Sequence, residues 1–310
     1  MTGIVYDDIY LRHDTGEHPE SAERLRVITA HLKKAGLWDS LKRIAPRCAT
    51  EDEIKLVHAA DLVRRVESVA KGGGGNMDAD TVVSEASYEV ALWAAGGALN
   101  AVDAVMAGHA SNALCLLRPP GHHATPVRAM GFCLFNNVAI AARYVQRKHG
   151  VKRVLIVDWD VHHGNGTQDT FYRDGSVMYF STHRYPFYPG TGRRDEIGEG
   201  PGQGLIVNVP LPFNTRPETL IQEFEDVMKT KAGPFKPEFV IISAGFDAYR
   251  RDPIGGLNLE PEHFRTLTDL LKGVADASAK GRIVSCLEGG YSLTGLPLCV
   301  EQHVRALAGR

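Results

Sequence analysis

Short runs of apolar residues recur along the chain, and several of them lead into acids or histidines. Val154–Val157 has four consecutive apolar residues, mostly β-branched, which is typical of a strand buried on both faces of a parallel sheet. Comparable runs predict strands at residues 4–6, 113–117, 177–183, 205–209, 239–247 and 283–287. In an open α/β sheet, ligands collect beyond the carboxyl ends of the strands, so the residues after these runs are functional candidates.

Longer segments between the strands have the composition of helices. Helices are predicted at residues 51–70, 84–107, 217–231 and 296–307. Another helix is expected to open at His18–Arg24, where a proline and acids suit a first turn, and another at Gly131–Asn137, where asparagines stand at a capping position. Gly96 and Gly97 indicate close packing of the long alanine-rich helix. With no internal repeat and no linker, residues 1–310 are predicted to form a single domain.

The richest motif follows the strand that begins at Val154. Asp158, Asp160 and His162 alternate, which gives them a common side if the chain stays extended. Two carboxylates and an imidazole suit a divalent metal such as zinc, which keeps three protein ligands and one open position in catalytic sites. Gly164 and Gly166 then allow a tight turn around whatever is bound.

Three further strand ends carry reactive side chains. His122 and His123 follow Arg-Pro-Pro-Gly, in which the prolines restrict the backbone that aims the two imidazoles. Asp247 ends another predicted strand, and Tyr291 follows Glu-Gly-Gly at the end of the last one. The convergence of four such ends predicts one catalytic site, whereas each motif alone is compatible with a structural role.

Composition excludes several classes of partner and compartment. The 310 residues are 44% hydrophobic, and the formal net charge of −2 gives no field that would favour nucleic acid or an acidic membrane. Five cysteines without a paired spacing indicate reduced thiols, and no amino-terminal signal or long apolar run is present, so a cytoplasmic location is expected. Gly72–Gly75 is a flexible break. No Lys-Ser or Lys-Thr follows it, which rules out a phosphate loop of the P-loop type.

These motifs together resemble the histone deacetylase superfamily, in the class II-like bacterial branch with acetylpolyamine amidohydrolases and acetoin-utilisation proteins. The resemblance extends along nearly the whole chain. It implies an arginase/deacetylase-like fold, which is an open and mainly parallel β-sheet flanked by helices with the site at the carboxyl strand ends. It also implies zinc-dependent hydrolysis of an N-acyl amide, most simply acetyl-lysine.

The resemblance assigns roles to the residues at the strand ends. The zinc ligands would be Asp160, His162 and Asp247. His123 would be the general base and acid, His122 would act electrostatically, and the Tyr291 hydroxyl would stabilise the oxyanion. The partners of the two histidines would be Asp158 and Asn165. One branch of the family has Asp where this chain has Asn165, and the neutral partner fits the class II-like branch.

The resemblance also implies monovalent cations, a substrate tunnel and a buried arginine. A potassium ion would bind at Asp158, Asp160, His162, Ser181 and Thr182, largely through backbone carbonyls, and a second at Phe171, Asp174, Val177 and Leu205. The substrate would contact Gly131, Phe132, Tyr188, Ile254 and Gly290. Arg24 matches an arginine beneath the active site, although its spacing equally fits an exposed helix position.

Three alternatives remain open at this stage. Hydrolysis of acetylpolyamines is one, but polyamine-selective relatives place Glu where this chain has Ile254, which weakens that hypothesis. A catalytically silent acyl-lysine binder is another, and the presence of Tyr291 disfavours it. An arginase-like reaction would need a two-metal cluster with more aspartates, against which the tandem histidines argue. The metal itself is zinc or iron.

Overall fold

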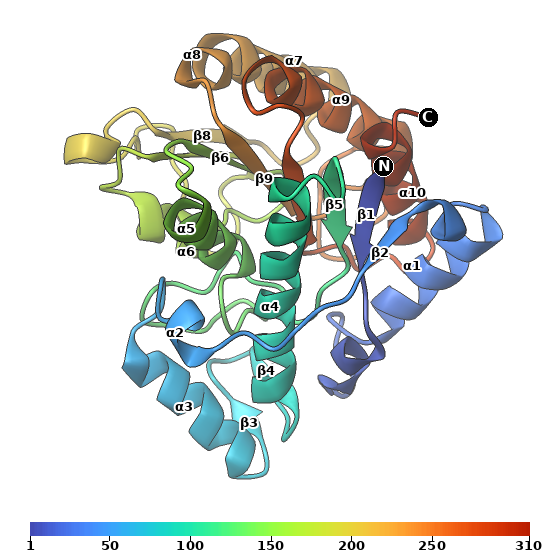
Figure 1. Cartoon of the computed structure of the whole chain (residues 1–310), viewed down its shortest axis with the longest axis vertical. Coiled ribbons are helices and arrows are strands. Elements are labelled where there is room, and N and C mark those ends of the chain that lie inside the picture. The colour runs from blue at the N-terminus through green and yellow to red at the C-terminus, as the bar shows by residue number, and fades with distance from the viewer.

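A parallel sheet of eight strands crosses the centre of the computed structural model, which describes residues 1–310 (Figure 1). The strands lie in the order β2-β1-β5-β10-β9-β6-β7-β8. Their bounds are β1 (Thr2–Val5), β2 (Lys42–Ile44), β5 (Asn112–Cys115), β6 (Val154–Asp158), β7 (Val177–Arg184), β8 (Ile206–Leu211), β9 (Phe239–Ala244) and β10 (Ile283–Leu287). β3 (Gly75–Asn76) and β4 (Val82–Val83) form a separate antiparallel pair. The predicted open parallel α/β sheet is therefore confirmed.

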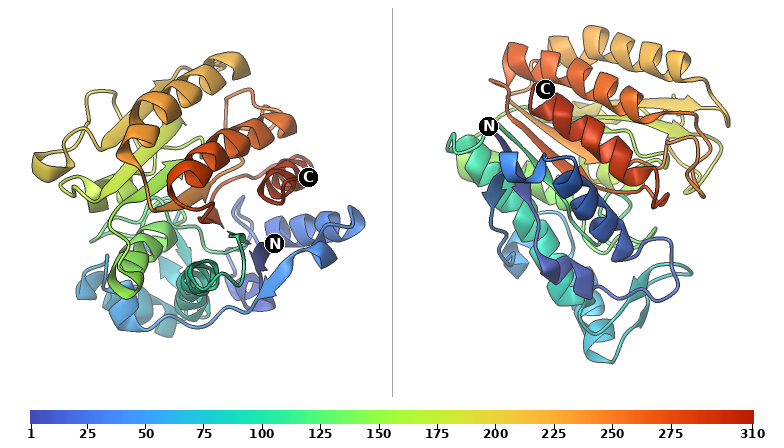
Figure 2. Two further views of the ribbon diagram at one scale, coloured as in Figure 1. Left: turned by 45° about the horizontal axis from the view of Figure 1, so that its top comes forward. Right: turned by 90° about the vertical axis from the view of Figure 1, so that its right-hand side faces the viewer.

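Helices cover both faces of this sheet, as the two views of Figure 2 show. One layer contains α1 (Glu23–Lys34), α7 (Pro217–Val227), α9 (Pro261–Ser278) and α10 (Leu296–Leu307). The other contains α4 (Ser87–Met106) and α5 (Asn137–His149), with α2 (Glu51–Ile54), α3 (Ala60–Lys71) and α6 (Asn165–Phe171) nearby. The short α8 (Gly233–Phe235) follows a π-helical turn at Met228–Ala232. No helix of the chain is both long and apolar enough to cross a membrane.

The central strands are continuous apolar runs in the sequence because they lie in the core. Every residue of β5, β6, β9 and β10 is buried, because helices pack on both faces of the sheet. The expected close packing of α4 is confirmed at Gly97, where a Cβ would lie 2.5 Å from the Tyr10 hydroxyl, and at Gly96, where it would meet the backbone of Arg47. Asn136 caps α5 by accepting from the Ala139 N–H, as predicted.

Several boundaries differ from the prediction. The helix expected from His18 begins only at Glu23, because Glu20 turns inward and its carboxylate is fully buried. Residues 51–70 form two helices, and the break between them contains His58, which is buried and bonded to Thr125 and Asn136. The strand expected at 239–247 ends at Ala244, so Asp247 lies in the following loop.

The prediction missed the short strand β2, the hairpin of β3 and β4, the short helices α6 and α8, and the long helix α9. For α9 a signal was available. Pro261 opens it, and the buried residues follow helical spacing at Phe264, Leu267, Thr268, Leu271 and Ala275. The two strands of the hairpin have two residues each, too few to produce a period.

Candidate active site

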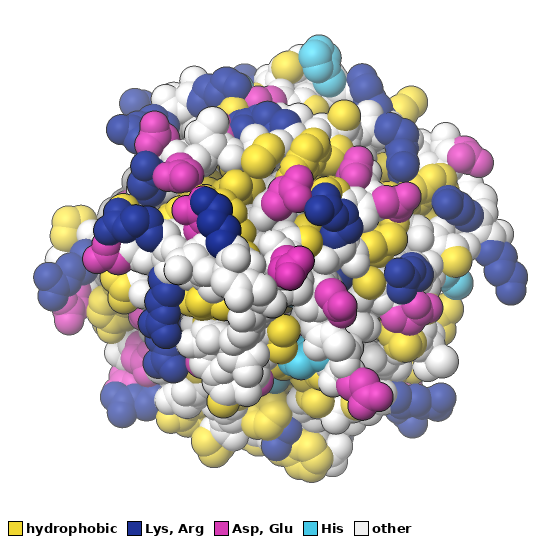
Figure 3. Space-filling model, turned by 90° about the horizontal axis from the view of Figure 1, so that it is seen from below, with side chains coloured by type: hydrophobic (Ala, Val, Ile, Leu, Met, Phe, Trp, Pro, Cys, Tyr) yellow, Lys and Arg dark blue, Asp and Glu magenta, His cyan; other side chains and the backbone are white.

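The four strands that carry reactive side chains are neighbours, in the order β5-β10-β9-β6. All eight strands of the sheet run the same way, so their carboxyl ends meet at one edge, which is the lower side in Figure 1. Figure 3 views the molecule from that side: charges of both signs are spread over the face, and a mainly uncharged area with an exposed histidine lies near its centre. The predicted convergence of these four strand ends is confirmed.

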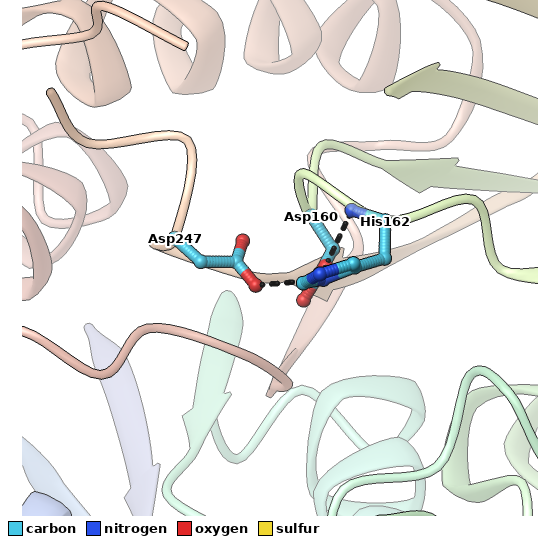
Figure 4. Close-up of side chains that lie close together, drawn as sticks. All are labelled: Asp160, His162 and Asp247. Atoms are coloured by element: carbon cyan, nitrogen blue, oxygen red, sulfur yellow. Dashed lines mark hydrogen bonds and ion pairs between the residues drawn. The ribbon is translucent and has the colours of Figure 1, made fainter. Parts of the chain in front are cut away.

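Asp160, His162 and Asp247 form a buried group beyond β6 and β9 (Figure 4). One ligand atom from each lies within 4.8 Å of the others. His162 Nδ1 is 3.1 Å from Asp160 Oδ1 and 3.2 Å from Asp247 Oδ2. The outer carboxylate oxygens are fixed by backbone N–H groups, Asp160 Oδ2 by Gly289 at 2.8 Å and Asp247 Oδ1 by Val161 at 2.8 Å. The three side chains therefore point at one small volume.

The expected common side for Asp158, Asp160 and His162 is only partly correct. β6 ends at Asp158, and the chain then bends, so the period of two does not continue. The Asp158 carboxylate turns away from the group, to His122 Nδ1 at 3.0 Å and the Tyr179 hydroxyl at 3.0 Å. Glycines make the bend possible: a Cβ on Gly245 or on Gly289 would collide with the Asp160 carboxylate.

The donor set fits a divalent cation. Asp247 Oδ2 is buried and has no hydrogen-bond donor of suitable geometry, which is costly for a carboxylate oxygen. Burial, reinforced by Asp160, raises the pKa of Asp247 to about 7. Burial would lower the pKa of His162, but the nearby Asp160 and Asp247 carboxylates outweigh this and raise it to about 9. Both shifts favour the protonated forms of this group, and a bound cation would supply the positive charge in place of those protons.

The tandem histidines lie beside this group and differ in their partners. His122 Nδ1 meets the Asp158 carboxylate, whereas His123 Nδ1 lies 2.8 Å from the neutral Asn165 Oδ1. Burial favours neutral His122, but Asp160 and Asp158 outweigh it and raise its pKa to about 10. Burial, with His122 and His162 adding to it, holds the pKa of His123 well below its usual value. The surroundings thus favour the protonated, cationic form of His122 and the neutral form of His123.

Tyr291 closes the site from the opposite side. It lines a pocket of about 190 Å³ together with Asp80, His123, Gly131, Phe132, His162, Tyr188 and Ile254. The Phe132 and Tyr291 rings meet edge to face with centroids 5.9 Å apart. Burial raises the pKa of Tyr291 well above its usual value, so its hydroxyl remains a proton donor.

Three of the predicted substrate residues have a positive φ. Gly131 has a φ of +57°, and a Cβ there would meet the His123 ring at 2.5 Å. Phe132 follows in the left-handed region with a φ of +68°. Gly290 has a φ of +114° and is not among the residues that line the pocket, and its carbonyl accepts from Arg24 Nε at 2.7 Å.

Beneath the pocket lies a network of buried charges, which we call the floor: Glu20, Arg24, Arg118 and Glu288. Arg24 Nη1 donates to Glu20 Oε1 at 3.0 Å, and Arg118 Nη2 donates to Glu20 Oε2 at 2.8 Å. Arg24 also donates to the carbonyls of Glu288 and Gly290, so the burial implied by the resemblance, rather than an exposed helix position, is correct. Glu288 Oε2 accepts from the backbone N–H of Gly121 and of His122, at 2.7 and 3.2 Å.

Sequence reasoning missed several contacts around the site. Asp80, from the turn between β3 and β4, lines the pocket, and no periodic pattern marks it. Phe187 stacks on the His162 ring at 5.2 Å with an interplanar angle of 17°, and His18 meets Phe132 edge to face at 4.5 Å. Cys133 is fully buried, and burial raises the pKa of its thiol well above the usual value.

The residues predicted to bind monovalent cations form an inner and a more peripheral set. Ser181 and Thr182 are buried in β7, which pairs with β6, and Thr182 Oγ1 has no hydrogen-bond partner. The more peripheral set is Phe171, Asp174, Val177 and Leu205. The Asp174 carboxylate is occupied by Arg143 and Ser176, which leaves its backbone carbonyl as the available ligand.

Comparison with known proteins gives a consistent result. A family model described as "Histone deacetylase domain" matches residues 18–307. The chain is 40% identical over 313 residues to a "Probable deacetylase" of Archaeoglobus fulgidus, covering 100% of this chain and 87% of that protein. It is 39% identical over 294 residues to the "Histone deacetylase-like amidohydrolase" of Pseudomonas aeruginosa, covering 94% and 77%. The crystal structure of the HDA15 HD domain matches with a TM-score of 0.95 at 39% identity, covering 100% of this chain and 88% of that one.

Proposed function

The chain belongs to the histone deacetylase family, and we propose that it is a zinc-dependent hydrolase of N-acyl amides on lysine side chains. The simplest substrate is acetyl-lysine, which would yield the free amine and acetate. One observation carries the proposal: the three side chains suited to a metal meet beside a pocket that His123 and Tyr291 also line. Residues 1–310 would act as one catalytic domain.

Asp160, His162 and Asp247 would hold the zinc ion. Their fit is supported by the buried Asp247 Oδ2, which lacks a hydrogen bond of suitable geometry, and by the raised pKa values of Asp247 and His162. When bound, zinc supplies a Lewis acid that activates water and polarises the scissile carbonyl. Three protein ligands leave a position open, as catalytic zinc sites require.

The tandem histidines divide the proton chemistry between them. His123 is favoured as neutral, so it can accept the proton of the attacking water and later deliver it to the leaving amine. His122, paired with Asp158, is favoured as a cation and would stabilise negative charge without transferring a proton. Asn165 holds His123 Nδ1, which leaves Nε2 for the proton transfer.

Tyr291 would donate a hydrogen bond to the carbonyl oxygen. This bond strengthens as the oxygen gains charge, so it stabilises the transition state more than the bound substrate. The backbone on both sides of Tyr291 is held in place: Arg24 bonds the Gly290 carbonyl, and the Asp252 carboxylate accepts from the Tyr291 N–H at 2.6 Å. The phenol would then need little reorganisation during the reaction.

Turnover of a fluorogenic acetyl-lysine peptide tests this proposal. Activity should disappear with a chelator and return on adding zinc, and a parallel addition of iron(II) decides between the two metals. Binding of the peptide without any turnover in the zinc-loaded protein would instead identify a silent acyl-lysine binder. Turnover that persists in protein shown to be metal-free would disprove the metal-dependent mechanism.

A small acylated amine is the second candidate, because Asp80 gives the pocket an acidic residue. A carboxylate there can accept either from a peptide N–H or from the ammonium group of a polyamine. Ile254, which lines the same pocket, provides no charge for a cation. A panel of acyl-lysine peptides and acetylated polyamines, compared by kcat/KM, decides between the two substrate classes.

Potassium is proposed as a structural ion at the inner set around Ser181 and Thr182 and at the peripheral set around Phe171. The unpartnered Thr182 Oγ1 supports the inner site. A ligand that binds only the folded state stabilises it by mass action, so the melting temperature should be higher in potassium than in a bulky organic cation. Identical melting curves, with no cation retained by the protein, would exclude both sites.

A further inference from the structure

A second and larger cavity adjoins the catalytic pocket. Its volume is about 480 Å³, and Ile254 lines both cavities, so a single side chain forms their shared wall. Its lining includes Arg184 and Arg250, the rings of Phe187 and Phe213, and Asp252. Of the residues that line this cavity, only Asp252 and Ile254 have a role in the function proposed above.

Arg184 is held in a fixed position at this cavity. Its guanidinium carbon lies 3.7 Å from the Phe187 ring centroid and 4.6 Å from that of Phe213, and Nη1 donates to the Gly255 carbonyl at 2.9 Å. Gly256, with a φ of +109°, makes room, since a Cβ there would lie 2.8 Å from Nη1. A guanidinium placed between aromatic rings loses little conformational freedom on binding an anion.

The charge of Arg184 has no counterion in the chain. It forms no ion pair, and its Nε and Nη2 donors have no hydrogen-bond partner. The other charged groups of the lining already have partners: an ion pair for Arg250, and backbone hydrogen bonds, which leave its negative charge in place, for Asp252. Arg250 pairs with Glu260 at 2.6 Å, and Asp252 accepts from the backbone N–H groups of Ile254, Tyr291 and Ser292. Arg184 is thus the one cationic side chain of the lining that is held in place and has no counterion.

We propose that this cavity is a subsite for the carboxylate of an aspartate or glutamate close in sequence to the acyl-lysine of the substrate. The inference rests on the proposed function and names a substrate feature for it. The catalytic pocket, at about 190 Å³, admits a side chain but not a polypeptide, so flanking residues must lie across its rim. An extended peptide advances about 3.3 Å per residue, so a residue one to three positions away can pass Ile254 and reach Arg184. Nε and Nη2 form the edge of a guanidinium that matches a carboxylate with two hydrogen bonds.

The test uses pairs of acetyl-lysine peptides that carry Glu or Gln at one position, scanned over three residues on each side. The zinc-loaded full chain is assayed for kcat/KM, and binding of the same peptides is measured separately by fluorescence anisotropy. At one position or more, Glu should be preferred about twofold to fivefold, as partly exposed ion pairs allow, and less so at high salt.

Variants locate the effect. Arg184→Gln should bring the Glu/Gln ratio to about one. Arg173→Gln makes the same charge change at an exposed arginine outside the cavity, and it should keep the wild-type ratio. Because Phe187 also stacks on His162, Phe213→Ala is the second variant: it removes one ring from the guanidinium, and it should reduce the preference while leaving zinc content unchanged.

The possible failures are distinguishable. A wild-type chain with no Glu preference at any position would overturn the subsite, and so would an equal loss in Arg184→Gln and Arg173→Gln, which would indicate a general field. If no peptide is turned over, the proposed function fails, but the anisotropy measurement still decides the subsite. Preferred binding of Glu peptides that Arg184→Gln abolishes would support it even then.

Discussion

The floor and the rim of the pocket are built in opposite ways. In the floor, Glu20, Arg24 and Arg118 are fully buried, and each is bonded to partners from distant parts of the chain. In the rim, Tyr188 is 36% exposed and Asp80 is exposed, and loops and a two-strand hairpin carry them. We therefore expect changes in the floor to affect the fold, and changes in the rim to leave it intact. Mutations in the two regions should therefore differ in kind as well as in size.

Removing a metal-binding side chain should have the largest effect. Asp247→Ala takes one of three ligands from the buried group and should abolish both zinc binding and turnover. The matched control is Asp269→Ala, a half-exposed aspartate on α9 that should behave as wild type. Metal content by atomic absorption and kcat/KM are measured on one preparation. Full activity in an Asp247→Ala protein shown to be metal-free would contradict the ligand assignment.

Breaking the floor should cost stability. Glu20→Gln leaves Arg24 and Arg118 buried without their counterion, and such losses cost about 3–5 kcal/mol. Glu23→Gln, three residues along and half-exposed, is the control and should change the free energy of unfolding by less than about 1 kcal/mol. Urea denaturation at pH 7 measures both variants. Equal stability of the two would mean that the buried network is not a stabilising unit.

The same variant has a pH signature. Burial would raise the pKa of Glu20, but Arg118 and Arg24 outweigh it and lower it to about 2. A carboxyl whose pKa is depressed on folding stabilises the fold above its unfolded pKa of about 4.3, and this contribution is lost as pH falls towards 2. The stability gap between wild type and Glu20→Gln should therefore narrow between about pH 4.3 and pH 2. A gap that is constant over this range would remove Glu20 as its cause.

Tyr291 stands where floor and rim meet, and its substitution should affect catalysis alone. Tyr291→Phe removes one oxygen, so kcat should fall by about 10²–10³, or about 2.7–4 kcal/mol, while KM, zinc content and stability change little. Tyr172→Phe, at a tyrosine outside the pocket, should leave kcat unchanged. A Tyr291→Phe protein within about threefold of wild type, against that expected loss, would make Tyr291 a structural residue.

The fold and the site could be predicted from the sequence where a local apolar pattern is directly followed by reactive side chains. The apolar run at Val154 predicts a buried strand, and the polar residues after it predict a site at the end of that strand. Both predictions hold because β6 ends at Asp158, just before Asp160 and His162. The tandem histidines after Pro119 and Pro120 and the asparagine cap of α5 are local in the same sense. Strands of a parallel sheet end on one side, so local patterns were enough to bring four strand ends together.

What could not be predicted depends on contacts between distant residues. Glu20 reads as a helix-opening acid until Arg118, 98 residues later, meets its carboxylate. Asp158 alternates with the metal-binding residues, yet it turns to His122 and Tyr179, which only the folded sheet brings near. Asp80 sits in a turn between two-residue strands and has no pattern at all. The rim is thus the region about which the sequence says least.

The smallest effect is expected at the rim, from Ile254→Glu. Wild type should have a higher kcat/KM for acetyl-lysine peptides than for acetylspermidine, and the new carboxylate, near Asp80 in the same pocket lining, should shift the ratio towards the cation about twofold to fivefold. Ile254→Gln is the uncharged control and should leave the ratio near wild type. A wild-type preference for acetylspermidine would instead promote the small-amine candidate.

The same substitution separates rim from floor in a second way. Ile254 also lines the cavity of Arg184, so a glutamate there should compete with an acidic peptide residue for that cation and lower the preference for Glu-flanked peptides. Both shifts should fade with added salt, since partly exposed charges are screened. Zinc content and the free energy of unfolding should stay near wild type, because no bond of the floor involves Ile254. A loss of zinc or of stability in Ile254→Glu would show that the rim, like the floor, contributes to metal binding or to the stability of the fold.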